Sequence, residues 1–141
     1  MGLDNGFVVK SNKRKLTRAD LPKEIQYPFA EDYGDAPEII YWRKNWGLRN
    51  MMVRSILRPE HPNKDEDDNY IYSVDTSKDV MNVISAISYF LNEEIWESEG
   101  SSIWSYEEIR PILIENIGNL AIMAIFMDQN PDVYLEFYDS Y

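Results

Sequence analysis

Residues 112–138 read ILIENIGNLAIMAIFMDQNPDVYLEFY, and this stretch decides the fold class. From Ile112 to Met127 the residues are apolar almost all round, which is typical of a helix at the centre of a core. Asn130-Pro131 is a turn signal. After it, Val133, Leu135 and Phe137 alternate with Tyr134, Glu136 and Tyr138, which predicts a strand over 132–138. A buried helix followed by an alternating strand favours a fold of the α+β class.

The start of this helix has two possible positions. Ser105-Tyr106-Glu107-Glu108 has the S-x-x-E form of a capping box, in which the serine and the glutamate bond each other's backbone N–H groups. Pro111 follows within two turns, and proline disturbs a helix interior but suits a first helical position. Either the helix begins at 106 and bends, or a turn precedes a helix whose first residue is Pro111.

A second helix is predicted before it. Thr76 or Ser77 can cap its N-terminus, and its apolar residues recur at helical spacing until the helix ends near Gly100. Two short segments rich in β-branched and aromatic residues, 6–10 and 70–74, predict strands.

A third helix is predicted over 38–58. Asp35 can cap it, Pro37 suits its first turn, and Pro59 stops it. Its apolar residues follow helical spacing: Ile39, Trp42, Trp46, Val53, Ile56 and Leu57.

These elements predict one domain over 1–141, with about three long helices packed against a small sheet of about three short strands (6–10, 70–74 and 132–138). The composition agrees with a globular domain, because 44% of the residues are hydrophobic and 28% are charged. Neither a repeat nor a linker divides the chain.

The charges are distributed unevenly along the chain, whose net charge is −11. Residues 1–58 hold 11 of the 14 lysines and arginines but only 7 of the 25 acids, whereas residues 59–141 hold 3 cations and 18 acids. The two parts can neutralise each other within the fold. Alternatively, each can face a partner of opposite charge, nucleic acid for the basic part or a basic protein for the acidic part.

Several kinds of chemistry have no support in the sequence. Cysteine is absent, His61 is the single histidine, and no glycine-rich phosphate loop is present. We therefore expect no catalytic residues, no metal site and no cofactor. The N-terminus lacks the pattern of a signal peptide, and the most apolar stretch, 117–127, is shorter than the ~20 residues that span a bilayer. These features favour a cytoplasmic protein with no membrane partner.

Two short motifs resemble a family of small uncharacterised phage and prophage proteins. The chain opens Met1-Gly2-Leu3-Asp4 and later carries Tyr41-Trp42-Arg43-Lys44, which in that family lies on the first long helix. The order of elements over about two-thirds of the chain is also similar. The chain departs from the family at Asn5-Gly6-Phe7 and after Lys44. The resemblance implies a phage origin and a location in the host cytoplasm, and it implies no activity.

Two surfaces are candidates for binding. On the predicted helix over 38–58, a basic face consists of Arg43, Asn50, Arg54 and Arg58, with Gly47 in its middle and Lys44 beside Arg43. Guanidinium groups suit phosphate or carboxylate ligands, although this face can equally pair with the acidic half of the chain or with Asp4. The second surface is the outer side of the terminal strand, formed by Tyr134, Glu136 and Tyr138. As the last element, this strand is predicted at a sheet edge, where it could pair with a partner strand or with a second copy.

The function that we expect is that of a phage-encoded binding protein without enzymatic activity, which acts on a host protein as an inhibitor of a host or defence factor. Two alternatives remain open: a nucleic-acid-associated protein that uses the basic helix face, and a protein that binds a small molecule or nucleotide. A homodimer through the terminal strand is also open, since the net charge opposes it while the unguarded strand edge favours it.

Overall fold

Our computed structural model describes residues 3–32, 34–57, 63–64, 69–100 and 102–140. Its strands are β1 (Asp4–Ser11), β2 (Glu38–Arg43), β3 (Asn63–Lys64), β4 (Tyr70–Val74) and β5 (Val133–Ser140). Its α-helices are α1 (Trp46–Met51), α2 (Ser77–Tyr89), α3 (Glu93–Glu99) and α4 (Tyr106–Gln129), with a 3-10 turn η1 (Arg18–Asp20) and a π-helical segment η2 (Met52–Ile56). The predicted α+β class is confirmed, but the described residues contain five strands and four α-helices rather than about three of each.

The strands form one antiparallel sheet in the order β2-β1-β5-β4-β3. The terminal strand β5 pairs with β1 along its whole length, from Val133 opposite Ser11 to Ser140 opposite Asp4, and with β4 on its other side. The prediction that this strand lies at an edge is therefore wrong: β5 is central, and β2 and β3 are the edges. Its backbone groups are used within the sheet, so it cannot pair with a second copy.

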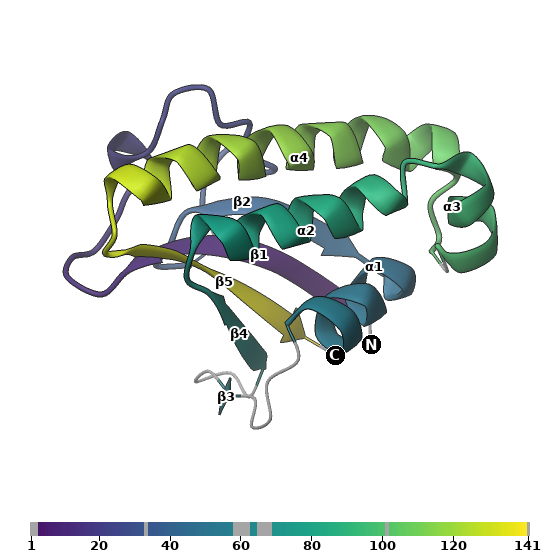
Figure 1. Ribbon diagram of the computed structural model, residues 1–141, viewed down its shortest axis with the longest axis horizontal. Helices are drawn as coiled ribbons and strands as arrows, with labels where there is room; N and C mark the ends of the chain where they lie inside the picture. The colour runs from purple at the N-terminus through teal and green to yellow at the C-terminus, as the bar shows by residue number, and fades with distance from the viewer. Residues whose placement is uncertain (1–2, 33, 58–62, 65–68, 101, 141) are drawn as a thin grey trace.

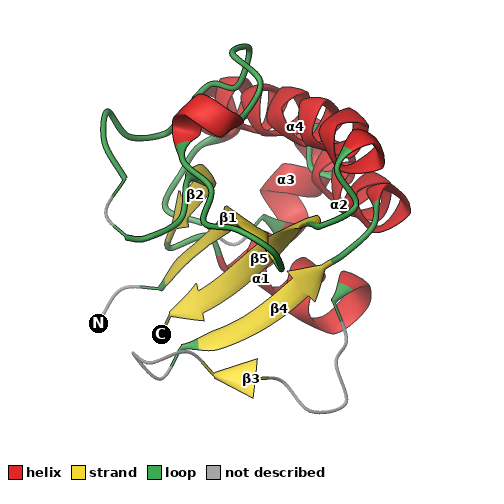
Figure 2. Cartoon of the chain, turned by 90° about the vertical axis from the view of Figure 1, so that its left-hand side faces the viewer, coloured by secondary structure: helices red, strands yellow, loops and turns green. Residues whose placement is uncertain are grey.

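All four α-helices cover one face of the sheet (Figure 1), and the other face carries no helix among the described residues (Figure 2). The two longest helices, α2 and α4, lie side by side across the strands. The core forms between these helices and the inner side chains of β1 and β5, where Phe7 and Phe137 approach with ring centroids 5.1 Å apart.

Helix α4 begins at Tyr106, which decides between the two predicted starts. Ser105 accepts from the N–H of Glu108 at 3.2 Å, and Glu108 accepts from the N–H of Ser105 at 3.1 Å, so the capping box forms and Pro111 lies inside the helix. Leu113, Leu120 and Met123 are fully buried, but Ile114 and Ile125 are exposed on the opposite side. The helix is long and apolar enough to cross a membrane, as core helices of globular domains can also be, and here its buried side packs against α2.

The predicted second helix is two helices. Thr76 caps α2 as expected, by accepting from the N–H of Asp79 at 3.1 Å. The chain then turns at Phe90–Asn92, where Asn92 caps α3 by accepting from the N–H groups of Glu94 and Ile95. The hydroxyl of Tyr106 donates to the carbonyl of Leu91 at 2.5 Å, which ties this turn to the start of α4.

The predicted helix over 38–58 is wrong in its first half, because residues 38–43 form the edge strand β2. The segment is β-branched and aromatic, and the free edge of β1 supplies hydrogen-bonding partners for it. A register shift between Phe7 and Val8 marks an irregularity that lets the neighbouring residues Ile39 and Ile40 both be buried. Lys44 then adopts a left-handed conformation (φ 51°), and the helix starts only at Trp46, which is 40% exposed rather than in the core.

Candidate functional site: the open face of the sheet

The basic helix face that the sequence predicts does not form. Arg43 lies at the end of β2, Lys44 in the left-handed turn after it, Asn50 on α1 and Arg54 on η2. Arg58 and the single histidine, His61, lie outside the described residues. Because a strand and a turn separate these cations, they present no continuous ridge to a nucleic-acid backbone.

The structure instead places Arg43 on the same side of the sheet as the second predicted surface, which consists of Tyr134, Glu136 and Tyr138. Side chains alternate along each strand, so the residues that do not face the helices share one side of the sheet, which we call the open face. The β1–β2 register places Arg43 opposite Asp4, and the β1–β5 register places Tyr138 opposite Gly6. The residues of the open face are Asp4, Gly6, Val8, Lys10, Glu38, Tyr41, Arg43, Ile71, Ser73, Tyr134, Glu136 and Tyr138.

Three polar contacts hold the side chains of the open face in place. The Tyr41 hydroxyl donates to Oδ1 of Asp4 at 2.8 Å, and the Tyr138 hydroxyl donates a short hydrogen bond to Oε2 of Glu38. Lys10 forms an ion pair with Glu136, with Nζ 2.8 Å from Oε2. These bonds fix the tyrosine rings before any partner arrives, which lowers the entropy lost on binding.

Gly6 makes the contact between β2 and β5 possible across β1. A Cβ atom at this position would lie 2.5 Å from the carbonyl oxygen of Ile40, 2.6 Å from Oε2 of Glu38 and 2.8 Å from the Tyr138 hydroxyl. Any larger residue would therefore clash with both the backbone and the hydrogen-bonded pair. The glycine is required here for its lack of a side chain.

Burial shifts the pKa values of these groups. Loss of solvent raises the pKa of Glu38 to about 7, although the hydrogen bond from Tyr138 opposes the shift. Burial, with the nearby Asp4 carboxylate, raises the pKa of Tyr41 to about 12, and burial beside Glu38 also raises the pKa of Tyr138. The tyrosines are thus neutral hydrogen-bond donors, whereas Glu38 changes its charge near neutral pH.

Exposed acids and a set of ion-paired cations from the segment 12–32 lie at opposite ends of the molecule. Figure 1 shows α3 and the start of α4 at one end and the segment 12–32 mainly at the other. In that segment Arg14 pairs with Asp132, and Arg18 pairs with Asp32. The α3 end carries exposed acids that form no ion pair with the described residues: Glu93, Glu94, Glu97, Glu107 and Glu115. Elsewhere in the described structure Lys10 pairs with Glu136 and Arg49 pairs with Asp139, so neutralisation within the fold is not confined to one end.

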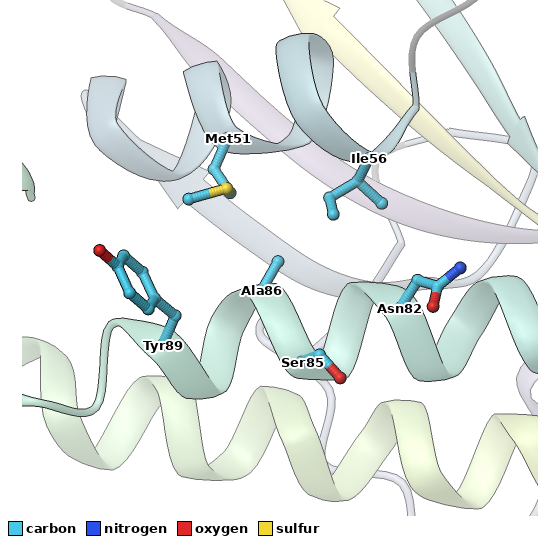
Figure 3. Close-up of a pocket in the computed structure, with 6 residues that line it drawn as sticks. All are labelled: Met51, Ile56, Asn82, Ser85, Ala86 and Tyr89. Carbon is cyan, nitrogen blue, oxygen red and sulfur yellow. The ribbon is translucent and has the colours of Figure 1, made fainter.

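A groove of about 440 Å³ lies between η2 and α2 on the helical side (Figure 3). Met51 and Ile56 face Ala86 across it, while Asn82 and Ser85 supply the polar atoms at its rim. Sequence patterns did not predict this groove, because the π-helical segment that forms one wall has no signal of its own.

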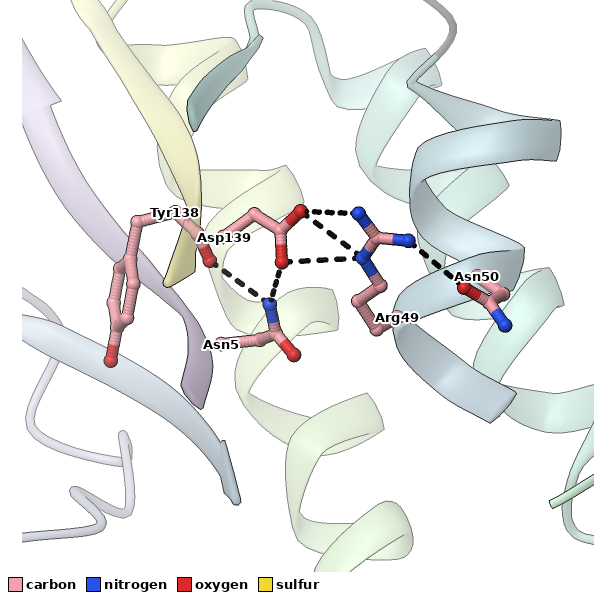
Figure 4. A network of polar contacts seen from close by, with 5 residues as sticks. All are labelled: Asn5, Arg49, Asn50, Tyr138 and Asp139. Carbon is pink, nitrogen blue, oxygen red and sulfur yellow. Dashed lines mark hydrogen bonds and ion pairs between the residues drawn. The ribbon is translucent and has the colours of Figure 1, made fainter. Parts of the chain in front are cut away.

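A buried polar network joins α1 to the central strand (Figure 4). Arg49 contacts the Asp139 carboxylate through Nη2 at 2.8 Å and Nε at 3.1 Å, and Asn5 donates to Oδ1 of Asp139 at 2.7 Å. Arg49 also donates to the side-chain oxygen of Asn50 at 3.0 Å. Asn50, a member of the predicted basic face, is therefore engaged within the molecule by Arg49.

Comparison of the chain with protein-family models, with curated proteins and with solved structures finds no match.

The sequence pattern identified the residues of the open face that lie on β5 but not the residues on β2 that lie beside them. The alternation in 133–138 predicts Tyr134, Glu136 and Tyr138 on the outer side of their strand, and they lie there. Glu38 and Tyr41 were assigned to a helix, so their contacts with Tyr138 and Asp4 could not be foreseen. The one sequence signal for these contacts is Gly6, because a glycine inside a strand often marks a close approach.

Proposed function

We propose that the chain is a binding protein without enzymatic activity, that it contacts a host protein through the open face of the sheet, and that this contact inhibits a host or defence factor. The single observation that carries the proposal is the set of tyrosines on a face without helices, Tyr41, Tyr134 and Tyr138, two of which are fixed by hydrogen bonds to carboxylates. The family resemblance implies a phage origin, and this origin favours a host protein as the partner.

The composition of the open face suits a protein partner. Tyrosine and arginine are enriched at the centres of protein interfaces because they combine apolar area with hydrogen-bonding groups. Here Tyr134 and Tyr138 lie on the central strand β5 with Glu136, the partner of Lys10, between them, while Arg43 lies on the edge strand β2. Charged groups at the rim of an interface mainly set its orientation and association rate.

The charge map also favours a protein over nucleic acid. The predicted basic helix face does not form, so the nucleic-acid alternative loses the surface on which it depended. The unpaired acids at the α3 end would repel a phosphate backbone and attract a basic protein surface. We therefore propose a partner whose contact surface is basic around an apolar centre.

The proposal can be tested by recovery of partners from a lysate of the host cell, with and without nuclease treatment. Tyr134→Ser removes an aromatic ring from the open face, and Tyr89→Ser makes the same change on α2, where Tyr89 is exposed. We expect one protein to be recovered in both lysates by the wild type and by Tyr89→Ser, and to be lost or strongly reduced with Tyr134→Ser. Equal recovery by the two variants, or recovery that requires intact nucleic acid, would refute the proposal.

A further inference from the structure

The outward side of α4 carries a row of exposed apolar residues. Ile114, Gly118, Ala121 and Ile125 recur at alternating intervals of four and three, which is the spacing by which one helix packs along another. Ile114 is 44% exposed and Ile125 is 64% exposed. We call these four residues the α4 seam. No charged residue occurs from 116 to 127, so the seam lies in an uncharged surface of the kind that marks an interaction site.

Gly118, in the middle of the seam, is not required by the packing of the described part of the chain. A Cβ atom at this position would meet nothing within 4 Å, in contrast to the clash at Gly6. Glycine inside a helix also lowers stability relative to alanine, so the stability of a single copy does not explain it. The absence of a side chain at Gly118 would, however, let the backbone of a second helix approach α4 closely, with an isoleucine on each side of the contact.

The charges at the two ends of the seam are complementary to those of a second copy. Arg110 and Asp128 are exposed and form no ion pair with the described residues. They lie about five helical turns apart, so they share one edge of the seam. If two α4 helices lie antiparallel about a two-fold axis at the middle of the seam, Ile114 packs on the second copy's Ile125. The same axis brings Arg110 to the second copy's Asp128 at both ends of the contact.

We propose that the protein forms an antiparallel homodimer through the α4 seam. A parallel pair would set Arg110 against Arg110 and bring the two acidic α3 ends together, whereas the antiparallel pair places opposite charges in contact and the α3 ends apart. The contact from Arg110 to Asp128 is only about 27 Å long and the net charge of −11 opposes association, so the dimer should be weak and form in the micromolar range. The open face lies on the other side of the sheet (Figure 2), so the dimer does not depend on the proposed function.

Sedimentation equilibrium of the whole chain from about 5 to about 500 μM tests the dimer. We expect the mass of the wild type to rise towards twice that of the monomer. Gly118→Lys has room for its side chain in the single copy, but in the dimer it would bury a charge, so it should weaken dimerisation at least about tenfold. Gly34→Lys is the matched control, because it changes the net charge equally at an exposed position where a Cβ also meets nothing within 4 Å. It should dimerise as the wild type does.

Exchange of the end charges tests the antiparallel arrangement. Arg110→Asp and Asp128→Arg should each weaken dimerisation at least about threefold at low salt, and the double variant should restore it. The exchanged charges do not oppose the dipole of α4, so these variants should fold. A wild type that stays monomeric at about 500 μM would overturn the proposal, including one that binds phosphatidylcholine vesicles, since the seam would then face a membrane. Equal dimerisation by Gly118→Lys and Gly34→Lys, or no restoration by the double variant, would also overturn it.

Discussion

Replacement of Arg49 by methionine should destabilise the fold strongly. The Asp139 side chain is 0% exposed and that of Arg49 only 12%, and Arg49 is the cation that neutralises Asp139 in their ion pair. Methionine would leave the carboxylate buried, with the Asn5 amide at 2.7 Å as its remaining side-chain donor among the described residues. Loss of one partner of a buried pair costs roughly 3–5 kcal/mol, because the other charge stays desolvated and uncompensated.

Urea unfolding followed by tryptophan fluorescence would measure this loss. With a slope of about 2 kcal/mol per molar urea, the midpoint should fall by roughly 2 M relative to the wild type. Lys10→Met is the matched control: its ion pair with Glu136 is partly exposed, with the lysine side chain 41% accessible, so it should cost less than about 1 kcal/mol. A loss below about 1 kcal/mol for Arg49→Met would refute the argument that the network anchors α1 to β5.

Three further outcomes are expected. Leu120→Ala should cost roughly 2–5 kcal/mol in urea unfolding because Leu120 is fully buried on the inner side of α4, and an unchanged midpoint would contradict this central position. Glu38→Gln should make the protein more stable than the wild type by about 1 kcal/mol near pH 8, after allowance for solvent screening, and about equally stable near pH 4. The reason is that the pKa of Glu38 is raised to about 7 in the folded protein, so its protonated form stabilises the fold at low pH and this stabilisation is lost as the pH rises through that value. If the stabilities of both proteins changed with pH in parallel, the raised pKa of Glu38 would be refuted. Gly6→Ala should cost roughly 1–3 kcal/mol, because its Cβ would lie 2.5 Å from the carbonyl oxygen of Ile40, and wild-type stability of the variant would show that the strands can separate.

Local signals in the sequence predicted several elements well. The capping box at Ser105 and the cap at Thr76 act within three residues, so their chemistry is readable without knowledge of the fold. The alternation in 133–138 likewise gave the correct inner and outer faces of β5. Such signals concern neighbouring residues, so they can be read without knowledge of tertiary contacts.

The error over residues 38–43 has a physical cause. Trp42 and Trp46 are four residues apart, and Asp35 and Pro37 imitate the start of a helix, so the local pattern favoured the wrong element. The edge of β1 decides the conformation, because it offers hydrogen bonds to a β-branched segment that would gain little as a short helix.

The position of β5 shows a second limit of sequence reasoning. The last element of a chain is not thereby at a sheet edge, since the order of strands depends on pairings between residues more than 100 positions apart, such as Asn5 with Asp139. Deletion of 133–141 would remove the central strand, so this truncation cannot separate binding from folding. A point substitution on the open face is the appropriate perturbation.

NMR of protein with carbon-13 labelled tyrosines would show whether the proposed partner covers the open face. Upon addition of the partner recovered from the host lysate, the ring signals of Tyr41, Tyr134 and Tyr138 should shift or broaden, while that of Tyr89 on α2 should not. A response at Tyr89 with unchanged signals from the three open-face tyrosines would show that the partner binds the helical side and not the open face.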